Sequence, residues 1–203
     1  MKRHPFKVVV VTGAPGVGKT TVLALLSKLL EERKARFIIS NFGDYMLKAA
    51  VKAGYAKTRD EIRKLNQRVQ LGLQELAAEL IIRDAEEKIG EDGVLIVDTH
   101  SIIKTRTGLW PGLPENVVKT LLPDAIVLIE AKPEVILERQ LRDKTRDRGD
   151  VADVEFLREF LAQARIAAIA SAVHTASAVV MVENPEGEPI KAAETIMRII
   201  ETI

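Results

Sequence analysis

Residues 7–21, KVVVVTGAPGVGKTT, decide the fold of this 203-residue chain. The valines at 8–11 form an apolar run without polar alternation, which is typical of a parallel strand covered on both faces. From Gly13 to Thr20 the sequence matches G-x-x-x-x-G-K-[ST] in full, and a helical pattern follows. A strand, a glycine-rich turn and a helix in this order predict a loop that binds phosphate.

The loop residues have the chemistry that a nucleotide requires. Glycines let successive backbone N–H groups converge on phosphate oxygens, and the start of the following helix adds positive potential. Lys19 supplies a positive charge for the β- and γ-phosphates, and Thr20 offers a hydroxyl to Mg²⁺. The alternative is a tight turn that merely uses glycine, but the full match between a strand and a helix favours nucleotide binding.

Four further apolar runs alternate with helical patterns along the chain. Their β-branched residues indicate buried strands, and they lie at 36–40, 94–97, 125–130 and 178–182. Together with the first run they predict a five-stranded parallel sheet between two layers of helices, which is a three-layer, doubly wound α/β fold. A chain of this length is expected to form one domain with one main core.

Helices are expected between these strands. The apolar spacing indicates helices at 18–32, 133–145, 150–173 and 189–200. Thr58 and Glu61 form a capping box that opens a long helical stretch carrying apolar residues from Leu65 to Leu80. The connection between the second and third strands therefore spans about fifty residues, more than one crossover helix needs. We expect an inserted unit there, at 41–68.

The composition limits the class of protein. The 30 basic and 29 acidic side chains give a net charge of +1, which supplies no global field for nucleic acid or anionic membranes. There is no cysteine, so disulfides, thiolate metal sites and thiol nucleophiles are excluded. The apolar run at 8–11 is too short for a signal peptide or a membrane span. We therefore expect a cytoplasmic protein that binds neither nucleic acid nor membranes.

A carboxylate near the metal is expected at the carboxyl end of a strand close to the phosphate loop. Asp98 directly follows the run at 94–97 and fits this position, with a residue that caps the strand end as the alternative. Asp44 and Asp124 follow no such run. His100 is expected to have a structural role or to contact substrate, because phosphoryl transfer depends on positioning and charge neutralisation more than on a strong base.

The stretch after Asp98 does not turn back directly into a helix. It runs through His100, several hydroxyl side chains and two cations before it reaches Leu-Trp-Pro-Gly-Leu-Pro. We expect residues 99–106 to line the acceptor pocket and residues 110–114 to form a stiff turn into the next helix.

The class of phosphate-binding protein follows from what else the chain contains. A GTPase needs a base-reading N/T-K-x-D motif, and the near match at 143–147 lies in an arginine-rich helical segment. A motor or transport ATPase usually has a coupling domain, for which 203 residues leave little room. A kinase of a small molecule fits the length, with its second substrate in the unit at 41–68.

Cations are expected around the phosphates of two substrates. Arg139, Arg142 and Arg146 are spaced three and four apart, so they share one helical face. With Arg148 just beyond, they predict a short phosphate-binding lid at 139–150, and the interleaved acidic residues leave a salt-bridged surface helix as the alternative. A second group of cations lies in the inserted unit: Lys48, Arg59, Arg63 and Lys64.

Several short motifs occur in order along nearly the whole chain. They are residues 8–13 with 15–18, Asn41-Phe42-Gly43 with Met46, Arg59-Asp60 with Arg63-Lys64, Asp98-Thr99-His100-Ser101 with Lys104-Thr105, residues 111–114, Pro123-Asp124 and Thr145-Arg146. In this combination the chain resembles the archaeal-type adenylate kinases, which are nucleoside monophosphate kinases with a phosphate loop. The resemblance implies the reaction ATP + AMP ⇌ 2 ADP with Mg²⁺, a cytoplasmic enzyme and commonly a homotrimer.

The resemblance also implies roles for individual residues. ATP is expected to bind Gly13, Ala14, Pro15, Gly16, Val17, Gly18, Lys19, Thr20 and Thr21. The catalytic cations are Lys19, Arg139, Arg142, Arg146 and Arg148. AMP is expected to bind Gly43, Lys48, Arg63, Asp98, His100, Lys104 and Arg106. Mg²⁺ is expected at Thr20 and, through water, at Asp98.

The sequence departs from the bacterial and eukaryotic adenylate kinases after Asp98. Those enzymes have Asp-Gly-Phe-Pro-Arg where this chain has Asp98-Thr99-His100-Ser101, so the arginine of that motif has no direct counterpart. We expect Lys104 or Arg106 to replace it. A long zinc-bearing lid is also missing, since the chain has no cysteine. Three alternatives stay open: a CMP or UMP kinase, a kinase of a non-nucleotide acceptor, and a nucleotide-dependent switch module.

Overall fold

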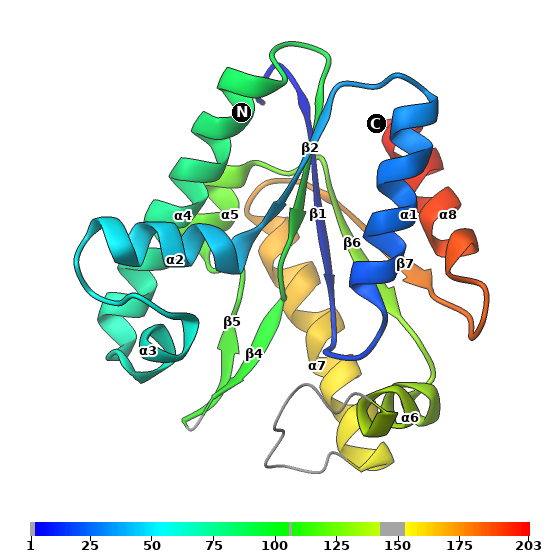
Figure 1. Ribbon diagram of the computed structural model, residues 1–203. Helices are drawn as coiled ribbons and strands as arrows, with labels where there is room; N and C mark the ends of the chain where they lie inside the picture. Colours follow the sequence, from blue (N-terminus) through cyan, green and yellow to red (C-terminus); the bar gives the residue numbers. More distant parts are fainter. Residues whose placement is uncertain (1–2, 106, 143–152) are drawn as a thin grey trace.

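A five-stranded sheet forms the centre of the computed structural model, which describes residues 3–105, 107–142 and 153–203. Its strands are β1 Lys7–Gly13, β2 Phe37–Asn41, β3 Val94–Asp98, β6 Ala125–Glu130 and β7 Ala178–Glu183. They stand in the order β2-β3-β1-β6-β7, and every neighbouring pair is parallel. The doubly wound α/β fold predicted from the apolar runs is confirmed (Figure 1).

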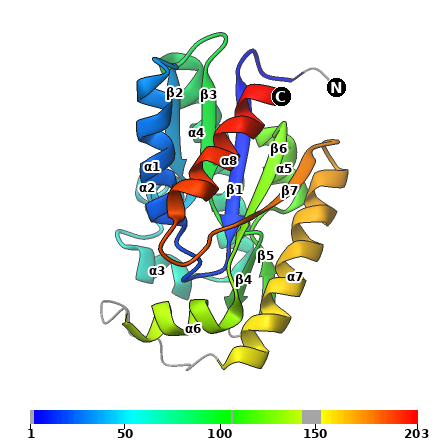
Figure 2. The same ribbon diagram turned by 90° about the vertical axis from the view of Figure 1, so that its right-hand side faces the viewer.

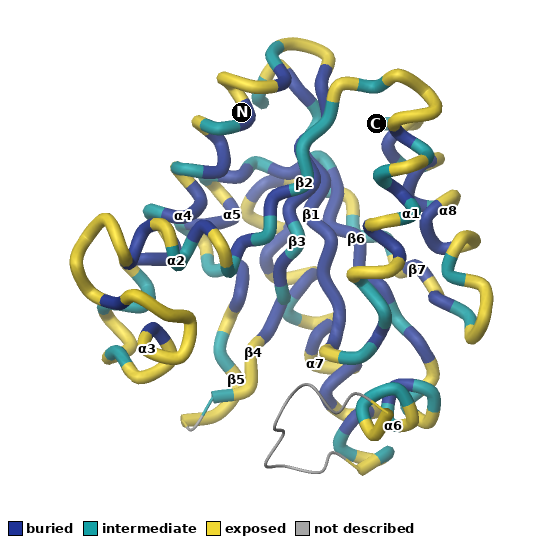
Figure 3. The backbone as a smooth tube through the Cα atoms, in the orientation of Figure 1, coloured by how far each residue is buried: buried dark blue, intermediate teal, exposed yellow. Residues whose placement is uncertain are grey.

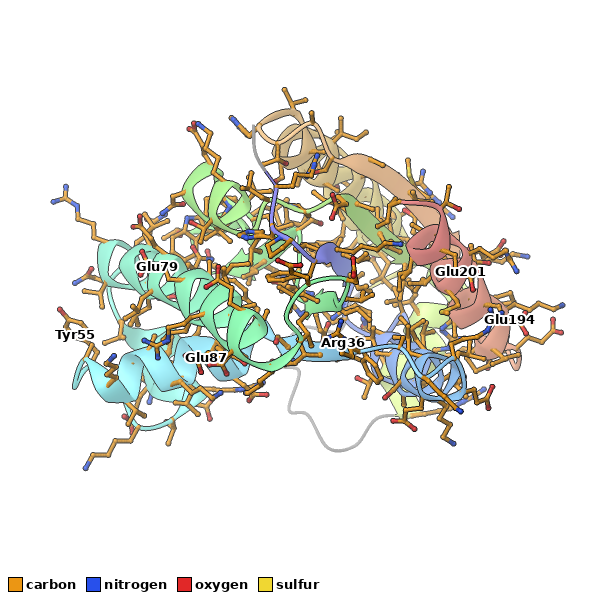
Figure 4. All side chains as sticks on the ribbon, turned by 90° about the horizontal axis from the view of Figure 1, so that it is seen from above. Arg36, Tyr55, Glu79, Glu87, Glu194 and Glu201 are labelled. Atoms are coloured by element: carbon orange, nitrogen blue, oxygen red, sulfur yellow. The ribbon has the colours of Figure 1, made fainter. Side chains whose placement is uncertain are left out.

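Helices cover both faces of this sheet. On one face lie α1 Lys19–Glu32 and α8 Pro189–Thr202, and on the other lie α4 Gln67–Lys88, α5 Glu115–Leu121 and α7 Val154–Val173 (Figure 2). Alternate side chains of β1 point to the two layers, so Val9 and Val11 belong to one apolar cluster and Val8 and Val10 to the other. Figure 4 shows the outer surfaces of these layers, with Glu79 and Glu87 on α4 at one flank and Glu194 and Glu201 on α8 at the opposite flank.

The central strand β1 brings the ends of its two neighbours together. Val11 stands opposite Asp98 of β3, and Gly13 stands opposite Ile129 of β6. After β1 the chain continues to β2 at one edge of the sheet. After β6 it continues to β7 at the other edge. In parallel sheets of this kind, ligands bind in the crevice outside the carboxyl ends of the strands, at the point where the strand order reverses.

The unit expected at 41–68 contains two short helices, α2 Phe42–Lys52 and α3 Arg59–Lys64. Ala49, Ala50, Ala56 and Ile62 form a small apolar cluster with Leu73 of α4, whereas Phe42 and Tyr45 of α2 belong to the apolar cluster that covers one face of the central sheet. Figure 3 shows that α3 and its flanking loops are largely exposed, whereas β1, β3 and β6 at the centre of the sheet are buried. The unit thus joins the main core through α2, whereas α3 buries only Ile62.

The prediction of one long helix after the capping box is wrong. Thr58 caps α3 as expected, because its hydroxyl oxygen accepts a hydrogen bond from the backbone N–H of Glu61 at 3.2 Å. The helix ends after six residues, since Leu65 has an extended backbone with ψ 154°. Asn66 then caps a separate helix, α4, by accepting from the N–H of Val69 at 3.0 Å. The apolar spacing continues across both helices and hides the break.

A short hairpin follows β3. Its strands, β4 Ile102–Thr105 and β5 Gly108–Pro111, pair in antiparallel register. The prediction of a stiff turn at 110–114 is therefore wrong for its first two residues, which belong to β5. The backbone N–H of Gly112 donates to the carbonyl of Ser101 at 2.9 Å and closes the base of the hairpin. The chain then enters α5, as expected.

Within the described residues the helices on either side of the arginine-rich segment agree with the prediction, except that Asp153 is the cap of the second helix and not part of it. The helix expected at 133–145 is observed as α6 Pro133–Arg142. Asp153 caps α7, because its carboxylate accepts from the backbone N–H of Phe156 at 2.6 Å. The predicted helical positions at 143–145 and 150–152 lie outside the described residues.

Within the described part of the chain, no helix has both the length and the apolar character needed to cross a membrane.

Replacing glycine by alanine is expected to have opposite effects on stability at two positions, Gly112 and Gly72. A Cβ at Gly112 would lie 1.9 Å from the carbonyl oxygen of His100, so Gly112→Ala should lower the free energy of unfolding by about 1–3 kcal/mol. Gly72 lies in α4, and a Cβ there meets nothing within 4 Å, so Gly72→Ala should raise it by about 0.5–1 kcal/mol. Chemical denaturation of both variants measures these differences, and equal effects would contradict the close approach at the base of the hairpin.

Candidate active site

The phosphate loop at 13–18 connects β1 to α1 and can be built only with glycine at three positions. Gly16 and Gly18 have φ values of 96° and 91°, in the left-handed region that other residues rarely adopt. Backbone packing excludes a side chain at Gly13, where a Cβ would lie 2.6 Å from the carbonyl oxygen of Ile129. The glycines that the motif requires are therefore explained by backbone conformation and close packing.

Side chains from two distant segments hold the loop from outside. The carbonyl oxygen of Val17 accepts from Arg139 Nη1 at 3.0 Å and from Asn184 Nδ2 at 2.7 Å. The carbonyl oxygen of Pro15 accepts from Gln140 Nε2 at 2.6 Å. A loop whose carbonyl oxygens are engaged in this way can direct its N–H groups to an anion. Gln140 and Asn184 were not foreseen, because no local motif in the sequence marks them.

The two described arginines on the cationic face of α6 differ: Arg139 is held by contacts, and Arg142 is exposed. Arg139 donates to a single carboxylate oxygen of Glu186 through Nε at 3.0 Å and Nη2 at 2.6 Å. Arg142 has a side chain that is 70% exposed, and it pairs with Glu138 at 3.2 Å. Arg139 thus contacts the phosphate loop, whereas the ion pair of Arg142 with Glu138 is of the kind found on the exposed surface of a helix. Arg146 and Arg148 lie outside the described residues.

Lys19 and Asp98 form an ion pair at the mouth of the loop. Lys19 Nζ lies 2.9 Å from Asp98 Oδ1, and the two side chains are only 12% and 15% exposed. Lys19 is the first residue of α1, and Asp98 is the last residue of β3. The other carboxylate oxygen, Oδ2, accepts from Asn41 Nδ2 at 2.9 Å. The motif lysine and the carboxylate predicted from the strand end are therefore in direct contact.

This geometry fits a hydrated divalent cation. Asp98 Oδ1 is buried and meets no donor with hydrogen-bond geometry among the described residues, although Lys19 lies close as an ion pair. Thr20 is exposed in the first turn of α1, at the end of the helix that faces the loop. No three His, Cys, Asp or Glu side chains converge on one point in the described ranges. Mg²⁺ usually keeps several waters and binds few protein carboxylates, so these two residues suffice for it when phosphate oxygens are present.

The segment after Asp98 passes beneath the start of the loop. His100 Nδ1 lies 3.0 Å from the carbonyl oxygen of Gly13, so this nitrogen carries the proton in that hydrogen bond. The N–H of Ser101 donates to Thr12 Oγ1 at 2.6 Å. Lys104 Nζ lies 4.7 Å from the ring centre of Phe156 on α7. His100 therefore supports the loop, and the segment is tied to β1 and α7. Arg106 lies outside the described residues.

The cations predicted for the acceptor in the inserted unit lie apart from the Lys19–Asp98 pair. Lys48 Nζ lies 4.0 Å from the ring centre of Tyr45 and 3.8 Å from Asp84 on α4. Arg63 pairs with Asp60 at 2.6 Å within α3, and both side chains are largely exposed. The structure thus brings Lys19, Thr20, Asp98, His100 and Arg139 together at the loop, and it places Lys48 and Arg63 with partners elsewhere.

Asp84 is the centre of a polar cluster that ties α2 to α4. The hydroxyl of Tyr45 donates to Asp84 Oδ2 at 2.7 Å, and Lys88 Nζ lies 3.0 Å from the same oxygen. The Tyr45 hydrogen bond is the main cause that lowers the pKa of the Asp84 carboxyl, with Lys88 and Lys48 adding to it. Burial, followed by the Asp84 hydrogen bond, raises the pKa of Tyr45. Lys48 therefore contributes to the packing of the inserted unit.

The two other carboxylates considered for the metal have different partners. Asp124 lies before β6, at the opposite end of the sheet from the loop, where it accepts from the N–H of Val8 at 2.8 Å and pairs with Arg3 at 3.3 Å. Asp44 lies in the first turn of α2 and pairs with Arg59 at 2.5 Å. Neither contact involves the phosphate loop.

The fold and the loop define the class of protein: the chain has the fold of the phosphate-loop kinases. Residues 12–158 match the family model described as "AAA domain". A shikimate kinase from Bacteroides thetaiotaomicron superposes with a TM-score of 0.56 at 17% identity, covering 96% of this chain and 98% of that one. A shikimate kinase from Acinetobacter baumannii gives 0.52 at 18% identity, covering 97% and 94%. At these identities the likeness concerns the fold alone.

Curated relatives identify the family within this class. The adenylate kinase of Saccharolobus solfataricus is 48% identical over 191 residues, which are 94% of this chain and 97% of that protein. The adenylate kinase of Pyrococcus furiosus is 47% identical over 189 residues, 93% and 91% of the two chains. The chain belongs to the adenylate kinase family, whose members are phosphotransferases, and the resemblance drawn from the motifs is confirmed.

Removing the charge of Lys19 should impair phosphoryl transfer and leave the fold intact. Lys19→Met is expected to lower kcat by about 100-fold or more, because a preorganised charge beside the phosphates is lost. Lys28→Met is the matched control, since Lys28 is exposed on the same helix. Steady-state kinetics together with melting curves measure both effects, and near-normal turnover of Lys19→Met would exclude the assigned role.

Proposed function

We propose that this protein is a Mg²⁺-dependent adenylate kinase that catalyses ATP + AMP ⇌ 2 ADP. Adenylate kinase relatives that match 94% of the chain support the reaction class. The observation that carries the proposal in this chain is the contact between Lys19 and Asp98 at 2.9 Å, at the mouth of a glycine-built phosphate loop. This contact places Lys19, the cation assigned to the donor phosphates, beside Asp98, the carboxylate assigned to the metal.

The chain's own residues supply positioning and positive charge for an in-line transfer. The loop amides at 13–18 and Lys19 hold the donor phosphates, with Thr21 in the first turn of α1. Arg139, Arg142, Arg146 and Arg148 offset charge that develops on the transferred group. Mg²⁺, when bound through Thr20 and the water-linked Asp98, neutralises charge on the phosphate oxygens of ATP. No covalent enzyme intermediate is required.

The acceptor is assigned to the inserted unit and the segment after β3. Its residues are Gly43, Lys48, Arg63, Asp98, His100, Lys104 and Arg106. We treat residues 1–203 as one kinase domain, with an AMP-binding excursion at 41–68 and a short lid at 139–150. Lys48 and Arg63 are long, exposed side chains, so binding an acceptor phosphate requires them to exchange Asp84 and Asp60 for it.

A panel of acceptors separates this proposal from its alternatives. Purified protein with ATP and Mg²⁺ should form ADP rapidly with AMP and at least about tenfold more slowly with CMP, UMP or shikimate, and EDTA should abolish the reaction. A preference for CMP or UMP would reassign the base specificity. Preference for shikimate would move the protein to the non-nucleotide kinases that share its fold. Slow ATP hydrolysis that no acceptor stimulates would indicate a switch module.

We also propose that the enzyme is cytoplasmic and forms a homotrimer through α7. The support is the family resemblance and an apolar stripe on α7, where Ile166, Ile169 and Val173 are 60%, 47% and 75% exposed. Spacings of three and four residues put these side chains on one face of the helix. A stripe of this kind on an outer helix is typical of a contact between subunits.

Light scattering should give a mass three times that of the 22.4 kDa chain. Ile169→Glu should shift the mass toward that of the monomer, because a charge would be buried in the contact. Ile190→Glu is the control, since Ile190 is also exposed but lies on α8. A monomeric wild-type protein, or a trimer that Ile169→Glu leaves intact, would contradict the assembly through α7.

A further inference from the structure

Asn41 connects the phosphate site to the inserted unit through one side chain. It is the last residue of β2, stands opposite Asp98 in the parallel register and is the cap residue of α2. Its Nδ2 donates to Asp98 Oδ2 at 2.9 Å. Its Oδ1 accepts from the backbone N–H of Asp44 at 3.2 Å and from Arg59 Nη2 at 3.0 Å. The nitrogen of the amide therefore contacts the phosphate site, and its oxygen contacts the inserted unit.

The chemistry of its partners fixes the orientation of this amide. The N–H of Asp44 and the guanidinium of Arg59 can only donate, so the oxygen of Asn41 must face them. The carboxylate of Asp98 can only accept when ionised, so the amide nitrogen must face Asp98. A flipped amide would put its NH₂ group against the two donors, Asp44 N–H and Arg59, and its oxygen against the acceptor Asp98 Oδ2. Neither aspartate nor serine can satisfy all three contacts, because neither offers a donor and an acceptor at opposite ends.

Arg59 carries the connection into α3. It is the first residue of that helix, and besides Asn41 it contacts the carboxylate of Asp44 at 2.5 Å. Gly43 leaves the space for this contact, since a Cβ there would lie 3.2 Å from Asn41 Oδ1 and 3.3 Å from Arg59 Cζ. Lys19, Asp98, Asn41 and Arg59 thus form a continuous series of contacts from the phosphate loop to the inserted unit.

Binding of a nucleotide changes the charge at one end of this series. The ammonium of Lys19 must exchange Asp98 for phosphate oxygens when ATP occupies the loop, so one oxygen of Asp98 changes its partner while the other stays bonded to Asn41. We propose that Asn41 is a positioning residue that couples occupation of the phosphate loop to the acceptor unit, and that Arg59 holds its amide in the coupling orientation. The proposal rests on the proposed function, in which the inserted unit binds the acceptor.

A simple helix cap is the competing role, and it needs only the side-chain oxygen. Asn66 is such a cap, since it is exposed and its Oδ1 accepts from the N–H of Val69 at 3.0 Å. Serine caps helices about as well as asparagine, so Asn41→Ser keeps the cap of α2 but is too short to bridge to Asp98. The pair Asn41→Ser and Asn66→Ser therefore separates coupling from capping.

The test measures coupling at equilibrium, without turnover. The dissociation constant of AMP is determined by calorimetry with and without saturating β,γ-methylene-ATP and Mg²⁺, and the ratio of the two values gives the coupling factor. We expect a ratio of about five or more in the wild-type protein, a ratio within about twofold of one in Asn41→Ser, and a wild-type ratio in Asn66→Ser. The melting temperatures of the two variants should be alike. In steady-state assays Asn41→Ser should lower kcat by about tenfold, because Asp98 loses its orientation.

A second pair of variants tests the arginine. Arg59→Ala should lower the coupling factor. In the double variant it should add little to the effect of Asn41→Ser, because the effects of substitutions at residues in contact are not additive. Arg83→Ala is its control, an exposed arginine of α4 that pairs with Glu87. The Arg59 variant also decides the question if Asn41→Ser fails to fold.

Two results would overturn the proposal. One is a wild-type ratio near one, and the other is a coupling factor that both Asn41→Ser and Arg59→Ala leave unchanged. If AMP does not bind the wild-type protein, the proposed acceptor is wrong, and the same titration with the monophosphate chosen by the acceptor panel decides the role of Asn41.

Discussion

The ion pair between Lys19 and Asp98 is the contact on which the rest of the site depends. Both side chains are largely buried, and a buried charge is costly unless its partner is fixed in place. The parallel register of β1 and β3 fixes Asp98, and the glycine turn that starts α1 fixes Lys19. Because each charge stabilises the other, ATP has to replace a good partner of Lys19 with a better one. Phosphate oxygens beside a helix N-terminus and a divalent cation are such a partner.

The remainder of the site is arranged around this pair by contacts between distant segments. The β7–α8 connection supplies Asn184 and Glu186, and α6 supplies Arg139 and Gln140, so the carbonyl side of the loop is held by both. Asn41 holds the other oxygen of Asp98 from β2. The loop is thus rigid where the donor phosphates bind. The inserted unit, to which we assign the acceptor, consists of short helices and long exposed cations, as expected if it admits and releases a second substrate.

The strands, the phosphate loop and α1 could be predicted from the sequence because their signals are local. A run of valines, a glycine motif and a 3.6-residue spacing each depend on neighbours along the chain. The break at Leu65 could not be seen, since the apolar spacing continues through it and Asn66 looks like any polar residue. The hairpin after Asp98 was missed because its strands are short and contain Pro111. The motif and the strand end pointed to Lys19, Thr20 and Asp98, of which Lys19 and Asp98 are in contact. Gln140, Asn184 and Glu186 contact partners more than forty residues away in the sequence and leave no local pattern.

The small apolar cluster of the inserted unit has a consequence for how this chain can change over evolution. Three of its five buried members are alanines, and α3 adds only Ile62 to it, whereas the main core receives Phe42 and Tyr45 from α2. Substitutions within α3 and its flanking loops can therefore reshape the unit to which we assign the acceptor, while the central sheet keeps almost all of its stabilising burial. If this unit selects the acceptor as we propose, the fold can acquire a new acceptor at a small cost in stability, because α3 and its flanking loops are largely separate from the core that keeps the chain folded.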